Sequence, residues 1–188
     1  DHTSGGSSPG IDTNDELISR LVRTWMGDRE RLRAVRHRAL ELAEELRSQA
    51  EPSPWAVCHG DPHLGNLIVV PGSEEVTLVD WDDAVLAPPE RDLMFVLGGG
   101  VLPFAPVTDE QQSWFLDGYG RIDVDPDRLV YFRCVRTLED ITELAEHVID
   151  TSRDREQRAE SLGYVEGMVS PAGLVVQALR TASRVTWS

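Results

Sequence analysis

The chain has 188 residues, of which 40% are hydrophobic, a size and composition that fit one domain with one sizeable core. Its 33 acidic residues against 18 basic ones give a formal net charge of −15, which argues against a nucleic-acid partner because phosphate backbones would be repelled. All 18 basic residues are Arg, and the absence of Lys excludes a complete P-loop or a Schiff-base enzyme within this chain.

Cysteine usage and hydropathy bear on the cellular compartment. Cys58 and Cys134 lie far apart and outside any C-x-x-C arrangement, so neither a disulfide scaffold nor a zinc site is indicated. The sequence contains neither an apolar run of 18 residues nor a charged-then-apolar leader. We therefore expect a cytoplasmic protein that does not span a membrane.

The N-terminal part is predicted to be helical after a disordered start. Residues 1–10 are rich in Ser and Gly, and we interpret them as a disordered lead-in or an artificial remnant, with the folded unit over residues 11–188. A short helix is predicted around residues 14–26. A longer amphipathic helix is predicted over residues 28–49, where apolar residues recur at alternating spacings of three and four: Leu32, Val35, Ala39, Leu42 and Leu46.

The pattern then changes to short β-type runs. Residues 53–81 contain three such runs, and a Pro71-Gly72 turn between the last two predicts a hairpin. Helical signals return after Pro89, and the predicted helices cover residues 90–97, 108–119, 127–150, 153–168 and 171–183. Within residues 127–150, Cys134 falls on the apolar face and is predicted to be a core residue. The run Gly98–Gly100 is interpreted as a flexible loop between helices.

One stretch points to chemistry: H-G-D-P-H-L-G-N at residues 59–66, followed after the hairpin by Asp80. Transfer of a phosphoryl group needs the acceptor hydroxyl to be aimed and the phosphates to be held by a metal ion. Asp61 would accept or orient the hydroxyl proton, Asn66 would bind one Mg²⁺, and Asp80 would bridge Mg²⁺ to the phosphates of ATP. Oxygen ligands of this kind suit a hard cation.

Two other interpretations of this stretch are open. Asp61 in Gly-Asp-Pro could be a simple turn residue, because these residue types favour turns. His59, Asp61 and His63 could bind zinc as an H-x-D-x-H cluster, but that scheme leaves no place for Asn66 and Asp80. The coincidence of Asp61, Asn66 and Asp80 favours phosphoryl transfer over both.

The same residues resemble the aminoglycoside phosphotransferase family, which shares the protein-kinase fold. The likeness rests on the loop at 59–66, on V-D-W-D at 79–82 and on P-P-E-R-D-L ending at Leu93. Further segments resemble the spectinomycin phosphotransferase branch: residues 86–95, 98–100, 115–120 and 139–141. The resemblance implies an α+β, mostly α fold, namely the C-terminal (large) lobe of a protein-kinase-like enzyme with a small β hairpin region. The N-terminal lobe of that family, with its ATP-binding Lys, would be absent.

The resemblance also implies roles for neighbouring residues. Ile68 and Val79 would form the apolar floor beneath adenine, and Asp92 would accept N–H groups of the catalytic loop. His59 and His63 would brace that loop. Trp81 and Asp82 are candidates for contact with the substrate, with core packing for Trp81 and a solvated loop position for Asp82 as the alternatives.

The expected function is ATP- and Mg²⁺-dependent phosphorylation of a small cationic hydroxylated molecule, such as the aminocyclitol spectinomycin. Residues 48–188 carry 24 acidic residues against 10 Arg, which would attract a cation. The alternatives are a kinase of an amino alcohol, a sugar or a homoserine-like metabolite, and a non-catalytic binding module. We expect the chain alone to fold without being active, and its exposed strip around Ile68 and Val79 to be covered by the absent lobe or by a second copy in a homodimer.

Overall fold

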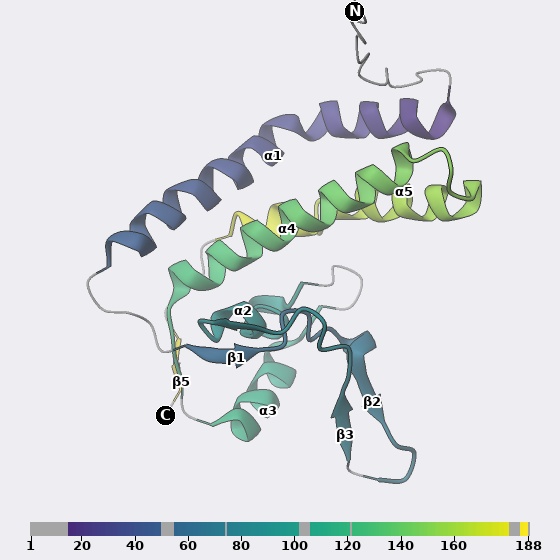
Figure 1. Cartoon of the computed structure of the whole chain (residues 1–188). Coiled ribbons are helices and arrows are strands. Elements are labelled where there is room, and N and C mark those ends of the chain that lie inside the picture. Colours follow the sequence, from purple (N-terminus) through teal and green to yellow (C-terminus); the bar gives the residue numbers. More distant parts are fainter. Residues whose placement is uncertain are drawn as a thin grey trace, which may run out of the picture.

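Long helices and short antiparallel strand pairs make up the protein (Figure 1). The computed structural model describes residues 15–49, 55–73, 75–101, 106–120 and 122–180, and the backbone of residues 185–187. The helices are α1 (Glu16–Ser48), α2 (Glu90–Leu93), α3 (Asp109–Tyr119), α4 (Pro126–Ile149), α5 (Arg155–Val169) and α6 (Leu174–Ala178). The strands are β1 (Ala56–Cys58), β2 (Leu67–Val69), β3 (Val76–Leu78), β4 (Val85–Ala87), β5 (Ile122–Val124) and β6 (Val185–Trp187). The prediction of a mostly helical chain with a small β region is confirmed.

Helix α1 corrects the prediction of two separate helices before residue 50. It runs unbroken for 33 residues from its N-cap, Asp15, whose carboxylate accepts the N–H groups of Leu17 and Ile18. Gly27 costs helix stability but does not end the helix. The apolar stripe continues across it in phase, because Leu21 and Leu32 are eleven residues apart, about three helical turns.

Helix α4 lies at the centre of the helical layer, between α1 and α5 (Figure 1). Most of the apolar face predicted from the sequence is buried, namely Val130, Cys134, Ile141, Ala145 and Val148, and Leu138 on the same face is partly buried. Cys134 is fully buried, and burial raises the pKa of its thiol to about 11, as suits a core residue. A buried Arg158 joins the three helices, since its guanidinium donates to the Val148 carbonyl and lies 2.8 Å from the Asp15 carboxylate.

Two strand pairs frame the segment that contains the catalytic motif. The predicted hairpin pairs β2 with β3, so that Leu67 lies opposite Leu78. Strand β1 pairs antiparallel with β4, with Cys58 opposite Val85. The sequence pattern predicts no strand at β4, because three residues are too few to show an alternation. This pair closes residues 59–84 into one loop-and-hairpin unit whose two ends meet.

The C-terminal helical predictions also need correction. Helix α2 ends at Leu93, and the predicted helix over residues 90–97 continues instead as turns into the short 3-10 helix η2 (Leu97–Gly99). Gly98, Gly99 and Gly100 all have positive φ. A Cβ at Gly100 would lie 2.7 Å from the Phe95 carbonyl oxygen. The predicted helix over residues 171–183 shortens to α6, and part of that range lies outside the described residues, as do residues 1–10.

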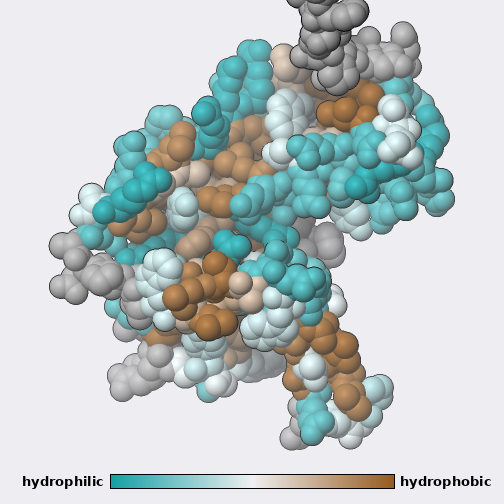
Figure 2. All heavy atoms as spheres, viewed as in Figure 1, coloured by the Kyte–Doolittle hydropathy of each residue, from teal (hydrophilic) through white to brown (hydrophobic). Residues whose placement is uncertain are grey.

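The hairpin β2–β3 extends away from the helical layer with apolar side chains on its surface (Figures 1 and 2). Ile68 is 50% exposed and Val79 is partly exposed, in the region where the sequence predicted an open apolar strip. Leu67, Val69, Val70 and Val76 are exposed as well. Among the described residues, no helix is long and apolar enough to cross a membrane.

The packing of α1 against α4 leads to a stability prediction. Replacing the fully buried Leu42 by Ala should lower the free energy of unfolding by about 2–5 kcal/mol, because the substitution removes apolar contacts and leaves a cavity. Leu40→Ala is the matched control, since Leu40 lies on the same helix and is 54% exposed. Urea unfolding followed by circular dichroism measures both variants. Equal losses in the two would contradict the assigned faces of α1.

Candidate functional site

Asp92 fixes the start of the loop over residues 59–66, which we call the catalytic loop after its predicted role. This loop follows β1, and the Asp92 carboxylate accepts the backbone N–H groups of His59 at 2.6 Å and Gly60 at 2.9 Å. Asp92 is placed there by α2, which follows β4 directly. Gly60 has a φ of +92°, and a Cβ at this position would lie 2.5 Å from the Asp83 carbonyl oxygen, so the loop needs glycine here.

His59 connects the catalytic loop to the end of the hairpin from a buried position. Its buried ring accepts the Asp61 N–H at Nδ1, 3.3 Å away, so Nε2 carries the proton and donates to the Val79 carbonyl oxygen at 2.8 Å. The ring of Trp81 lies 4.7 Å from the His59 ring, and the Trp81 indole N–H donates to the Leu78 carbonyl. His59 therefore braces the loop through backbone groups and has no nitrogen left for a zinc ion.

Asn66 ends the loop beside Asp61. It is buried in the 3-10 turn η1 (Leu64–Asn66), and its side-chain NH₂ donates to the Asp61 carbonyl oxygen at 2.9 Å. The Asn66 carbonyl accepts the Val79 N–H at 3.0 Å, which holds the end of β3 against the loop. The side-chain bond of Asn66 to a described residue uses its nitrogen, so its Oδ1 can serve a metal ion.

Asp80 has the one left-handed backbone among the described non-glycine residues, with a φ of +66°. Such a conformation costs free energy and persists only when the surroundings enforce it. The flanking bonds of Val79 and Trp81 supply that constraint. The described residues contain no group of three His, Cys, Asp or Glu side chains arranged for a metal ion, so Asn66 and Asp80 fit Mg²⁺ only if phosphate and water oxygens complete its shell.

The Asp61 carboxylate is held from both sides. Arg136 approaches Oδ1 at 3.1 Å, and His63 Nε2 lies 3.6 Å from Oδ2. The Nδ1 of His63 accepts the Gly65 N–H, so the proton of His63 is on Nε2, which faces Asp61. Oδ1 is buried without a hydrogen bond to any described residue, since the contact with Arg136 is close but misaligned. The Asp61 side chain is 21% exposed although Oδ1 is buried, so an acceptor hydroxyl would donate to Oδ2.

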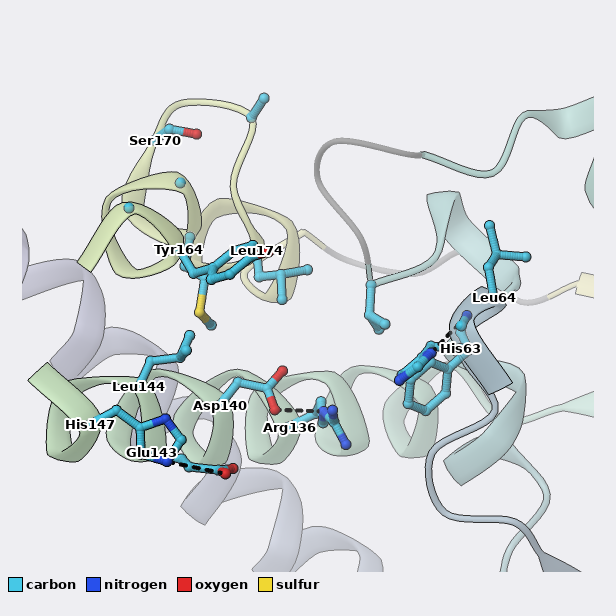
Figure 3. A pocket seen from close by; sticks show the side chains of 17 residues that line it. His63, Leu64, Arg136, Asp140, Glu143, Leu144, His147, Tyr164, Ser170 and Leu174 are labelled. Atoms are coloured by element: carbon cyan, nitrogen blue, oxygen red, sulfur yellow. Dashed lines mark hydrogen bonds and ion pairs between the residues drawn. The ribbon is translucent and has the colours of Figure 1, made fainter. Parts of the chain in front are cut away.

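A cavity of about 880 Å³ opens beside the catalytic loop (Figure 3). One wall is a stripe of ionisable side chains on α4: Arg136, Asp140, Glu143 and His147. The opposite side is formed mainly by α5 and the segment after it, including Tyr164, Met168 and Leu174. Burial raises the pKa of the Asp140 carboxyl in spite of the neighbouring Arg136.

The structure thus brings together His59, Asp61, His63, Asn66 and Asp92, with Val79 attached through its backbone. Trp81 and Asp82 are exposed and do not line this cavity, and Ile68 faces outward on the hairpin. Sequence reasoning missed Arg136 and the α4 stripe. Spacings of four, three and four between these ionisable residues were a usable signal, because they mark a second helical face beside the apolar one.

Two curated proteins match parts of this chain. A curated relative, Protein StrN of Streptomyces griseus, is 38% identical over 61 residues, which is 32% of this chain and 18% of that protein. The N-acetylmuramate/N-acetylglucosamine kinase of Caulobacter vibrioides is 32% identical over 110 residues, which is 54% of this chain and 30% of that protein. The chain therefore spans less than a third of the length of these relatives.

Two solved structures share the fold. Both are of the spectinomycin phosphotransferase APH(9)-Ia, one with ADP and spectinomycin (34% identity, TM-score 0.67) and one with AMP (32% identity, TM-score 0.71). The matches cover 87% and 92% of this chain but only 48% and 51% of those chains. The profile of the phosphotransferase enzyme family APH matches residues 6–163, a range that includes the whole catalytic loop, Asp80 and Asp92. With most of its length matched in this way, the chain belongs to the APH phosphotransferase family.

Proposed function

We propose that this chain supplies the catalytic loop and the acceptor cavity of an ATP- and Mg²⁺-dependent phosphotransferase that acts on a hydroxyl group. The observation that carries the proposal is the position of Asp61, whose carboxylate contacts Arg136 and His63, two residues of the cavity wall. A substrate held in the cavity would present a hydroxyl to Oδ2, the oxygen of Asp61 that is not buried. Asp61 would align the hydroxyl and take its proton.

The nucleotide would lie on the other side of the loop. Asn66 and Asp80 would hold Mg²⁺, which draws charge from the phosphates when bound. Ile68 and Val79 would support the adenine from the hairpin. A cytoplasmic location, where ATP is available, agrees with this role.

The remaining nucleotide contacts would come from a β-rich lobe outside these 188 residues. Two observations support this part of the proposal: the chain contains no Lys, and the hairpin exposes apolar side chains that a second body would cover. A second copy of this chain is the alternative cover. Measuring the size of the 188-residue chain in solution distinguishes a second lobe from a second copy, because only cover by a second copy predicts a dimer.

For the acceptor we propose an amino-bearing hydroxylated ring of the spectinomycin type. The wall of α4 offers the carboxylates Asp140 and Glu143, with Tyr164 and Met168 on the opposite side. The similarity to a spectinomycin phosphotransferase supports this choice. The similarity to a sugar kinase keeps an N-acetylated sugar as the second candidate.

A first prediction concerns Asp61. In the enzyme carrying both lobes, Asp61→Asn should lower kcat by about 10²–10⁴-fold while MgATP still binds, because the variant keeps the shape of the side chain but cannot take a proton. Asp117→Asn is the matched control, since Asp117 is exposed on α3. Steady-state kinetics with spectinomycin measure both. Full turnover in Asp61→Asn would refute the proposed catalytic loop, and turnover of about 1–100 per second by the 188-residue chain alone would refute the need for a second lobe.

Asp80 should affect a different step. Asp80→Ala should abolish the Mg²⁺-dependent part of ATP binding, because it removes an oxygen ligand of the metal ion. Calorimetric titration with ATP, with and without Mg²⁺, measures this part directly. Asp61→Asn serves as the comparison, since it should retain Mg²⁺-dependent binding. Unchanged Mg²⁺-dependent ATP binding in Asp80→Ala would show that Asp80 is not a ligand of the metal ion.

The acceptor is tested by specificity. We expect kcat/KM to be higher for spectinomycin than for N-acetylglucosamine, choline or a neutral hexose. We also expect KM for spectinomycin to rise with salt, because part of the attraction between the amine and the carboxylates is screened. Glu143→Gln should raise this KM and leave that for a neutral hexose unchanged. A preference for a sugar would discard the aminocyclitol and keep the phosphotransferase.

A further inference from the structure

We propose that Arg136 is a positioning residue for phosphoryl transfer: its guanidinium holds the carboxylate of Asp61 in the orientation that receives the acceptor hydroxyl. This inference rests on the proposed function, because it assigns Asp61 the role of accepting that hydroxyl. Arg136 lies on α4, far from the catalytic loop in sequence. No part of the loop motif includes it.

The guanidinium of Arg136 spans two carboxylates. Its Nη2 lies 3.1 Å from Asp61 Oδ1, and its Nε lies 2.7 Å from Asp140 Oδ1, one helical turn further along α4. All three side chains are largely buried, with exposed fractions between 21% and 24%. Asp61 and Asp140 would repel each other in such a site without a cation between them. Arg136 supplies that cation.

Arg136 is itself fixed before it reaches Asp61. The Asp140 carboxylate holds its Nε end, and the ring of Phe95 lies 5.5 Å from its central carbon, in the range of a cation–π contact. Burial alone would lower the pKa of Arg136, but the attraction of Asp140 and Asp61 outweighs it and raises that pKa. A planar guanidinium anchored in this way presents its Nη2 in one direction.

This arrangement restricts the Asp61 carboxylate. Oδ1 faces Arg136 and Oδ2 faces His63, so turning the plane of the carboxylate away from these partners would weaken both contacts. Oδ1 is buried beside Arg136, so this contact leaves Oδ2 as the oxygen that can receive the hydroxyl. Displacement of a reacting group by about 1 Å can cost roughly 10²-fold in rate. Loss of Arg136 should therefore act on kcat through Asp61.

The kinetic test uses the enzyme carrying both lobes, with MgATP and spectinomycin. Arg136→Ala should lower kcat roughly 10–100-fold with KM for MgATP unchanged. Arg136→Lys should lose less, because it keeps the charge but not the planar fork. Added guanidinium ion should restore part of the turnover of Arg136→Ala and none of that of Asp61→Asn. Arg128→Ala is the matched control, since Arg128 lies on the same helix, is 15% exposed against 24% for Arg136, and pairs with Asp125.

A spectroscopic test needs no turnover. In the ¹⁵N-labelled 188-residue chain, Asp61→Asn and Asp140→Asn should shift the guanidinium N–H signals of Arg136 and leave those of Arg128 in place. If Arg136→Ala does not fold, the shifts of the Arg136 signals and the kcat of Arg136→Lys test the role of Arg136 in its place. Unmoved Arg136 signals in Asp61→Asn, or an Arg136→Ala kcat within about twofold of the wild-type value, would overturn the inference.

The two proposals fail in different ways. Full turnover in Asp61→Asn would refute the proposed function, even if the Arg136 signals report the ion pair. A large loss in Asp61→Asn with unchanged turnover in Arg136→Ala would refute only the role of Arg136. Equal losses in Arg136→Ala and Arg128→Ala would indicate a general effect on α4 and would also overturn it.

Discussion

The site depends on one carboxylate that takes no part in the proposed chemistry. Asp92 accepts two consecutive backbone N–H groups, at His59 and Gly60, at the point where β1 becomes the catalytic loop. Hydrogen bonds to an ionised carboxylate are among the stronger ones in proteins. The direction in which the loop leaves β1 therefore follows from the position of α2. That position is set in turn by the pairing of β4 with β1.

Much of the fold follows from local pattern. The apolar stripes of α1 and α4 predicted the buried faces, since a 3.6-residue period leaves little choice of orientation. The hairpin followed from its Pro71-Gly72 turn. Pattern failed at Gly27, where packing on both sides keeps the helix intact, and at β4, whose three residues form a strand only because β1 lies beside them.

Part of the candidate site could likewise be predicted from local pattern, and part could not. Asp61, Asn66, Asp80 and Asp92 could be found from sequence because their spacing within a short stretch is itself the signal. Arg136 could not be found in this way, because its contact with Asp61 joins a loop to a helix that follows some seventy residues later. The cavity is lined by several elements that are far apart in sequence. Of its lining residues, only the ionisable stripe on α4 forms a pattern that can be recognised in the sequence. Helix α4 thus packs into the core through its apolar face and lines the cavity through its charged face.

The two cysteines have a practical consequence. Cys58 and Cys134 are both buried, and burial raises the pKa of each thiol to about 11, so neither is a ready nucleophile at neutral pH. Since these are the only cysteines in the chain, one engineered surface thiol would be the sole fast-reacting site for a maleimide dye or a spin label. Placed at an exposed hairpin position such as Val76, such a probe would report on what covers the hairpin without a background of native labelling.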